Sequence, residues 1–152
     1  MGRLRMKQPV RYQKLDPRAT TPSYGSAAAA GADLYALTDT PLTLAAGETA
    51  MVHTGIAVEI PQGYVGLVFA RSGLACKQGL APANKVGVID ADYRGEIMVA
   101  LHNHGTVHRT IESGERIAQL VLVPYLTAEF TEADSLSETD RGAGGFGSTG
   151  RR

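Results

Sequence analysis

The clearest signal along the chain is a run of short stretches in which apolar and polar positions alternate. Between Val52 and Ile60 the even positions are apolar or Thr, whereas the odd positions are mixed and include His53 and Glu59. A period of two places successive side chains on opposite faces of a β-strand. We therefore predict a strand over 52–60 with one buried face.

More strands are expected downstream at similar spacing. A turn at 61–63 precedes a strand over 64–70, and alternation of apolar residues over 97–101 indicates another. After a turn at 112–115, residues 117–123 form a more continuous apolar run. Such a run is typical of a strand that is buried on both faces.

The only good helix candidate is the segment 73–78, which Ser72 would cap and Gly79 would end. Many short strands and one short helix, punctuated by 18 Gly and 7 Pro, predict an all-β fold of the jelly-roll-like barrel or sandwich type. At 152 residues the chain most simply forms one domain. We expect a β-barrel domain over 1–130 and a flexible C-terminal arm over 131–152.

The arm differs from the rest of the chain in composition. Residues 131–140 are polar and acidic, and 141–150 contain five Gly in ten residues. Composition alone is typical of a disordered tail. The alternative is an arm that closes over a ligand, because consecutive Gly N–H groups bind phosphate and Phe146 has a ring suited to stacking on a base.

Charge and cysteine content exclude several classes of protein. The formal net charge is zero and the pI is about 6.9, so no global positive field favours nucleic acid. A lone Cys76 rules out an internal disulfide and a Cys-rich zinc site. The N-terminal residues 1–8 include basic residues but have no apolar region after them, so we expect no secretory signal, and no apolar run approaches membrane-spanning length. We expect a cytoplasmic protein without nucleic-acid or membrane partners.

The stretch from Asn84 to Gly95 carries the best candidate chemistry. Its apolar segment 86–89 and its Gly and Asp residues predict a β-hairpin or a tight corner between strands. An arm with few large side chains exposes N–H and C=O groups that read a flat polar ligand. Asp90 is placed to hold a water and take its proton, and Tyr93 to stack on a ring. The alternative is an ordinary Asp-rich turn.

Other polar residues also stand out. Arg71 and Ser72 lie at the start of the expected helix, where a guanidinium, a hydroxyl and the helix N–H groups can bind a phosphate. The alternative is that Ser72 is only an N-cap and Arg71 only a surface charge. Gln119 lies inside an apolar strand and needs a hydrogen-bond partner. His102 and His104 share one face of a strand, but without a further well-placed ligand they are better explained as solvated strand-end residues than as a zinc site.

Five stretches of the chain form one ordered set, namely residues 30–36, 70–75, 84–95, 114–120 and 141–150. In order and spacing they resemble the five motifs of the trimeric dUTP nucleotidohydrolases (dUTPases) of the bacterial type, over roughly residues 10 to 150. One departure is Ala70, where the family usually has Pro before its Arg.

The resemblance implies hydrolysis of dUTP to dUMP and pyrophosphate, by attack of water at the α-phosphorus with Asp90 as the general base. Asn84 and the backbone of 88–90 would read uracil, Tyr93 would pack under the deoxyribose, and the arm would cover the site. By resemblance, the substrate-binding residues are Arg71, Ser72, Gly73, Asn84, Val88, Ile89, Asp90, Tyr93, Met98, Gln119, Arg141 and Phe146.

The resemblance also implies a cofactor and an assembly. A Mg²⁺ ion would ride on the triphosphate, with Asp33 in its outer shell through water, which agrees with the tendency of Mg²⁺ to keep its waters. Three subunits would form a homotrimer in which each site draws on all three chains.

Two other functions are compatible with the same scaffold. A dCTP deaminase of the same fold would need a Glu where this chain has Ala100, and it usually has a second Ser where this chain has Gly73. A non-catalytic binding protein on this scaffold would be expected to lose Asp90 or the arm, and both are present.

Overall fold

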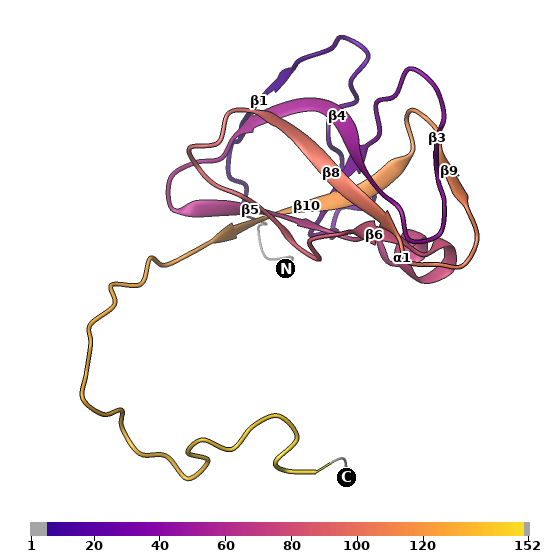
Figure 1. The fold of residues 1–152 in the computed structure, drawn as a ribbon. Coiled ribbons are helices and arrows are strands. Elements are labelled where there is room, and N and C mark those ends of the chain that lie inside the picture. The colour runs from indigo at the N-terminus through magenta and orange to yellow at the C-terminus, as the bar shows by residue number, and fades with distance from the viewer. Residues whose placement is uncertain (1–5, 151–152) are drawn as a thin grey trace.

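The computed structural model describes residues 6–150, which form ten strands and one short helix. Figure 1 shows a body of crossing strands, from which the C-terminal segment extends without contacting that body again. The elements are β1 (Arg11–Lys14), β2 (Ala32–Tyr35), β3 (Leu42–Leu44), β4 (Thr49–Glu59), β5 (Tyr64–Phe69), α1 (Ser72–Gln78), β6 (Leu80–Pro82), β7 (Gly87–Ile89), β8 (Glu96–Asn103), β9 (Arg109–Ile111) and β10 (Arg116–Pro124).

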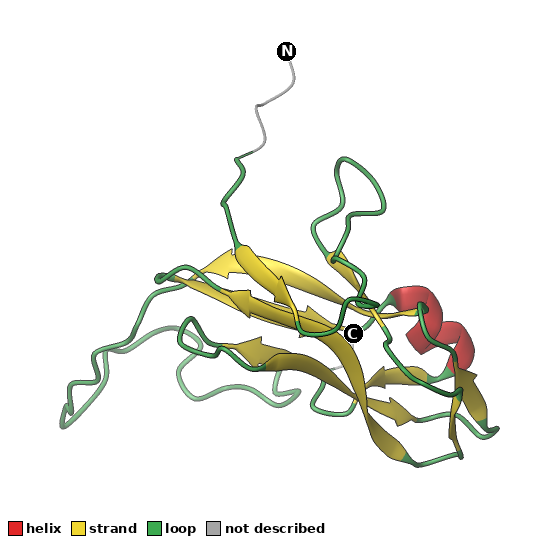
Figure 2. Cartoon of the chain, turned by 90° about the horizontal axis from the view of Figure 1, so that it is seen from above, coloured by secondary structure: helices red, strands yellow, loops and turns green. Residues whose placement is uncertain are grey.

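The strands are arranged in two layers (Figure 2). One four-stranded sheet has the order β1-β4-β8-β6, the other has the order β2-β10-β5-β7, and β3 pairs with β9 in a small third sheet. Side chains from both large sheets meet in one core, which includes Val52, Leu101 and Ile117. The predicted all-β jelly-roll-like fold is confirmed in its sandwich form, since the described strands form separate sheets and no closed barrel.

The predicted buried face of β4 is confirmed. Its even positions from 52 to 60 are all buried, and His53 on the opposite face is exposed. The odd residues Gly55 and Ala57 are buried as well, because the register with β8 shifts between His53 and Ala57. A bulge of this kind bends a strand and interrupts the alternation of its faces.

The prediction for 117–123 is correct for the strand but wrong for its burial. The strand β10 lies between β2 and β5. Ile117 and Ala118 are buried, whereas residues 119–123 are only partly buried. In the single chain, one face of the sheet supplies the core and the other face stays partly open to solvent.

The helix is where the sequence predicts it, with one correction. It starts at Ser72, so Arg71 is the N-cap residue and no side chain caps the helix. Gly79 ends it as predicted, with φ at 71° and its N–H bonded to the Leu74 carbonyl. The helix has only seven residues, and no helix in the part of the chain that the structure describes is long and apolar enough to span a membrane.

The C-terminal arm makes no regular structure after β10 ends at Pro124. Residues 125–143 are exposed throughout, and the ring of Phe146 is fully exposed. Tyr125 N–H still donates to the Gly63 carbonyl at 3.1 Å. Beyond Tyr125 the hydrogen bonds join near neighbours, such as Arg141 Nε to the Gly144 carbonyl at 2.7 Å. The arm therefore adds nothing to the core of its own chain.

Removing the arm should leave the stability of the body almost unchanged. A chain cut after Thr139 loses no core contact, so we expect its melting temperature to lie within about 2 °C of the full chain. If the arm covers the ligand, as the resemblance implies, the expected hydrolysis of dUTP should fall about tenfold or more. Thermal unfolding and steady-state hydrolysis measured on one preparation would test both expectations, and a large fall in melting temperature would mean that the arm is structural.

Candidate functional site

The predicted feature at Asn84–Gly95 is a corner between sheets rather than a hairpin. The strand β7 pairs with β5, with Ile89 opposite Gly66, and the chain then turns into β8 of the other sheet. Ile89 is buried, so it anchors the end of β7 in the core. Asp90, the next residue, consequently emerges at the surface at a fixed point.

A hollow of about 270 Å³ lies beside this corner. It brings together six residues that the sequence predicts to bind substrate, which are Asn84, Val88, Ile89, Asp90, Tyr93 and Met98. The rest of its wall is mostly apolar and includes Met51, Pro82 and Ala100. A small, largely apolar hollow with a few polar groups is the usual form of a small-molecule site.

The backbone of β7 is available to a ligand in this hollow. This strand is last in its sheet order, so one of its edges has no partner strand. Val88 in its centre is 63% exposed. Unpaired N–H and C=O groups of an edge strand form main-chain hydrogen bonds with whatever lies alongside. The edge of β7 is therefore suited to a flat ring with several donors and acceptors.

The carboxylate of Asp90 is free to act on a ligand or a water. Its backbone is held, since the carbonyl of Asp90 accepts a hydrogen bond from Tyr93 N–H at 3.2 Å. No side-chain hydrogen bond or ion pair engages the Asp90 carboxylate among residues 6–150. A carboxylate at the mouth of a hollow, with a fixed backbone and free oxygens, suits a general base.

Tyr93 is held against the start of β8. Its hydroxyl donates to the Glu96 carbonyl at 2.8 Å, and its ring lies across Gly95, where an added Cβ would come within 2.5 Å of the hydroxyl oxygen. The absence of a side chain at Gly95 thus permits this ring position. Tyr93 lines the hollow and is 43% exposed, so part of this residue is accessible to a ligand.

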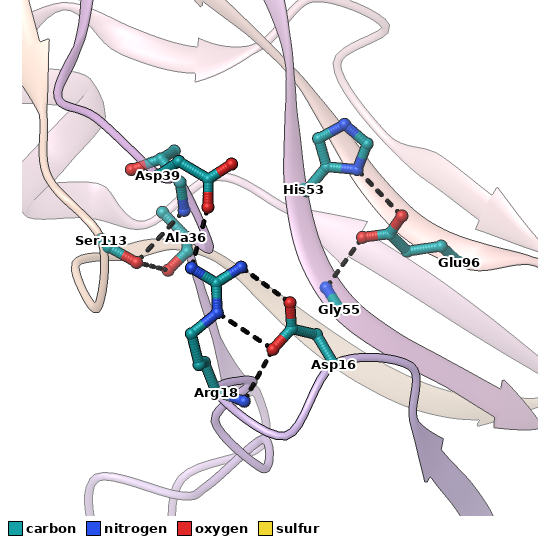
Figure 3. Close-up of polar contacts among 9 residues, drawn as sticks. Asp16, Arg18, Ala36, Asp39, His53, Gly55, Glu96 and Ser113 are labelled. Atoms are coloured by element: carbon teal, nitrogen blue, oxygen red, sulfur yellow. Dashed lines mark hydrogen bonds and ion pairs between the residues drawn. The ribbon is translucent and has the colours of Figure 1, made fainter.

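Glu96 joins the start of β8 to the bulge of β4 (Figure 3). His53 Nδ1 lies 2.9 Å from one of its oxygens, and Gly55 N–H donates to the other at 2.8 Å. Burial by itself raises the pKa of Glu96, but the hydrogen bonds from His53 and Gly55 outweigh that effect and hold the pKa below its ordinary value. Figure 3 also shows Arg18, which bridges Asp16 and Asp39 and holds the pKa of Asp16 down at about 2.

The lowered pKa of Glu96 predicts a dependence of stability on pH. A group with a depressed folded-state pKa stabilises the fold fully above its unfolded value, here about 4.5, and loses that effect as the pH falls through the folded value. Glu96→Gln should therefore lower the melting temperature near neutral pH, and the difference from the parent chain should shrink below pH 4.5. Melting curves across this range would measure it, and a constant difference would contradict the assignment.

A second polar cluster lies away from the hollow and centres on Asp33, a buried carboxylate of β2. Arg71 Nε donates to its Oδ1 at 2.9 Å, and Arg116 Nη1 lies 3.7 Å from its Oδ2. Gln119 is paired with Asp33 across the strands and donates to the Ala70 carbonyl at 2.8 Å. Two guanidinium groups share one carboxylate, so the cluster keeps a net positive charge that suits phosphate.

The remaining predicted residues are not gathered in one place. Ser72 and Gly73 are exposed beside Arg71 at the start of α1. Arg141 and Phe146 lie on the extended arm and contact neither the hollow nor the Asp33 cluster. A single chain thus carries the predicted site in three separate parts.

Some residues of these parts were missed from the sequence. Arg116 lies in the stretch 114–120 but only the ion pair with Asp33 gives it a role. Met51 enters the hollow because β4 pairs with β8, which sets it opposite Ala100. An exposed Met in an alternating strand gives no signal of such a position.

The two histidines have separate partners. His102 Nδ1 lies 2.8 Å from Thr49 Oγ1, and His104 Nε2 lies 3.1 Å from the Ala75 carbonyl. No group of three or more His, Cys, Asp or Glu residues placed to hold a metal ion occurs within residues 6–150.

Comparison with known sequences gives a consistent result. A family model described as dUTPase matches residues 17–150. The deoxyuridine 5'-triphosphate nucleotidohydrolase of Desulfitobacterium hafniense (strain DSM 10664 / DCB-2) is 51% identical over 146 residues, covering 95% of this chain and 97% of that protein. The protein of the same name from Shewanella pealeana is 44% identical, covering 97% of this chain and 100% of that protein.

Solved structures agree. The dUTPase of Staphylococcus bacteriophage 80alpha with dUPNHPP is 31% identical and has a TM-score of 0.86, covering 95% of this chain and 99% of that one. The dUTPase from phage phi11 of S. aureus is 26% identical with a TM-score of 0.78, covering 87% of this chain and 100% of that one. With a family model that spans most of the sequence and relatives that match nearly all of it, the chain belongs to the dUTPase family.

Proposed function

We propose that this protein hydrolyses dUTP to dUMP and pyrophosphate, with Asp90 as the general base for a water that attacks the α-phosphorus. The observation that carries the proposal is the position of the free Asp90 carboxylate beside the open edge of β7, at the mouth of the 270 Å³ hollow. The reaction removes dUTP, which keeps uracil out of DNA, and supplies dUMP for thymidylate synthesis.

Recognition of uracil would use the backbone of Val88 and Ile89 together with the side-chain amide of Asn84. These groups offer donors and acceptors to a flat ring, and the wall around them is mostly apolar. A close fit rejects thymine by its methyl group, and an inverted donor and acceptor pair rejects cytosine. Met98, at the edge of the hollow, would border the bound nucleotide.

The phosphates would bind to the Asp33 cluster and the helix start. Arg71 supplies a charged donor that is only partly exposed, Gln119 an amide, and Ser72 and Gly73 exposed backbone and hydroxyl groups. Charge-assisted hydrogen bonds of a guanidinium to phosphate are short and strong. Arg141 and Phe146 would complete the site when the arm closes over the nucleotide.

Members of the dUTPase family act with a divalent metal ion, and we propose Mg²⁺. Asp33 would act in the outer shell of the ion through water. Both of its oxygens face guanidinium groups and no second carboxylate lies beside it among residues 6–150, so it would not coordinate the ion directly. When bound to the triphosphate, the ion would neutralise phosphate charge and fix its geometry.

A homotrimer with shared sites is part of the proposal. The three parts of the site do not meet within one chain, and Met51, Val88 and Met98 leave apolar surface exposed around the hollow. The arm, over residues 131–150, is long enough to reach a neighbouring subunit, at up to about 3.4 Å per extended residue. A cytoplasmic location also remains a proposal.

Assay of dUTP, dCTP and dTTP tests the reaction. We expect dUMP and pyrophosphate from dUTP alone, and in ¹⁸O-labelled water the label should enter dUMP, because attack at the α-phosphorus adds the water oxygen there. A deaminase would instead release ammonia from dCTP, and a binding protein would release nothing. Ala100 in the wall of the hollow offers no acid or base for deamination. Label found in pyrophosphate would overturn the proposed site of attack.

Tyr93 should set the preference for deoxyribose. Its ring is fixed against Gly95, so a 2′-hydroxyl would collide with it. Tyr93→Ala should lower the ratio of kcat/KM for dUTP over UTP by about tenfold, since one steric contact contributes roughly 1–3 kcal/mol to discrimination. Tyr93→Phe, which keeps the ring and loses only the bond to Glu96, is the matched control. An unchanged ratio in Tyr93→Ala would refute the role.

A further inference from the structure

Arg94 follows the turn that carries Asp90 and Tyr93, and its side chain folds back onto that turn. Its Nη1 donates to the Ala91 carbonyl at 2.6 Å and to the Tyr93 carbonyl at 3.1 Å. Its Nη2 lies 3.4 Å from Glu59 Oε1 at the end of β4. A guanidinium holds several acceptors at once because its donors form a rigid planar fork. One side chain therefore joins two carbonyls of the turn to the neighbouring sheet.

Besides Arg94, the turn is held by the buried side chain of Ile89 at its start and by the Tyr93 hydroxyl, which donates to the Glu96 carbonyl at 2.8 Å. A single backbone hydrogen bond of 3.2 Å, from Tyr93 N–H to the Asp90 carbonyl, closes it. Besides the 270 Å³ hollow, a second, wider hollow of about 840 Å³ is lined by Asp90, Asp92 and Arg94. Asp90 thus lines both hollows, whereas Arg94 lines only the wider one.

Glu59, the ion-pair partner of Arg94, belongs to a strand that is paired on both sides. It sits at the end of β4, which pairs with both β1 and β8. Its second carboxylate oxygen lies 3.4 Å from Arg11 Nη1. Arg11 forms no hydrogen bond or ion pair with the turn among the described residues. Exposed ion pairs add little to the free energy of unfolding. We therefore expect the Arg94 contacts to affect the position of the turn more than the stability of the fold.

We propose that Arg94 is a positioning residue, which fixes the turn from Asp90 to Tyr93 so that the base and the sugar-packing ring keep their places in the hollow. This inference rests on the proposed function of Asp90 and Tyr93. Arg94 itself does not face the substrate, since it lines the wider hollow and not the 270 Å³ one.

Arg94→Gln removes the planar guanidinium group and its positive charge. We expect kcat for dUTP to fall about tenfold or more, because a displacement of about 1 Å of a catalytic group costs up to about 10² in rate. The dUTP/UTP ratio of kcat/KM should fall with it, because the Tyr93 carbonyl loses its hydrogen bond from Arg94 and the backbone that carries the ring is less well fixed. Arg11→Gln is the matched control, because it breaks only the other ion pair of Glu59, and both its kcat and its ratio should stay within about twofold.

A double-mutant cycle separates positioning from general damage. If Arg94 acts through Asp90, Arg94→Gln should change the residual kcat by less than about twofold in an Asp90→Asn background, since the base is already gone. Arg94→Lys, which keeps the charge without the fork, should be intermediate. Melting temperatures of all variants confirm that they fold.

Three results would overturn the inference. One is an Arg94→Gln enzyme with normal kcat and normal dUTP/UTP ratio, and another is equal loss in Arg94→Gln and Arg11→Gln. The third is a full loss from Arg94→Gln in the Asp90→Asn background, which would indicate an effect independent of the base. A fully active Asp90→Asn enzyme would instead overturn the proposed function, and this inference with it.

Discussion

Asp90→Asn should bind dUTP with nearly the affinity of the parent enzyme, and its turnover should be lower by about 10²-fold or more. The amide keeps the size and the position of the side chain, so the hollow keeps its shape. It cannot accept the proton of the attacking water, so the step that needs a base slows. Steady-state kinetics with dUTP, together with a binding measurement using a non-hydrolysable analogue, would separate turnover from affinity.

Asp92→Asn is the matched control for this change. Asp92 is an exposed carboxylate in the same turn, but it lines the wider hollow and not the one that holds the candidate site. We expect its kcat to stay within a few-fold of the parent value. Parent-like turnover in Asp90→Asn would remove Asp90 from the role of base, and a large loss in Asp92→Asn would make that carboxylate the next candidate.

The strands were predictable where a strict local pattern governs them. The alternation over 52–60 and over 97–101 identifies the buried faces of β4 and β8, because each strand packs one face on the core. The glycine after the helix was predictable too, since the left-handed conformation of Gly79 disfavours other residues. The hairpin or corner at Asn84–Gly95 remained open, because pairing with β5 depends on contacts that are distant in sequence.

The site was predictable as a list of residues but not as an arrangement. Residues of the corner meet in one hollow because they are close in the chain. Arg116 and Arg94 gain their roles only from partners far away, Asp33 and Glu59, and no local pattern encodes such pairs. Local pattern also misplaced the start of the helix. Ser72 is a residue type that favours the N-cap position, but it is the first residue of the helix and Arg71 is the N-cap.

The separation of the site into three parts within one chain leads to the second large effect. Asp90→Asn and Arg141→Ala, each nearly inactive alone, should regain activity when they are refolded together in equal amounts. If Asp90 and Arg141 of one site come from different chains of a ring, an intact site needs one subunit of each kind in the right order. Random mixing then restores about a quarter of the sites, because each of the two positions is correct half the time.

The reverse arrangement of the same two changes makes the test quantitative. A chain with both Asp90→Asn and Arg141→Ala, refolded with the parent chain in equal amounts, should also keep about a quarter of the sites if they are shared between chains. If each site is built within one chain, the two mixtures differ sharply: the single mutants restore nothing, and the double mutant with the parent keeps about half. Mass measurement on the mixed oligomers shows that the subunits have exchanged. With that established, activity of about half in the second mixture and none in the first would rule out sites shared between subunits.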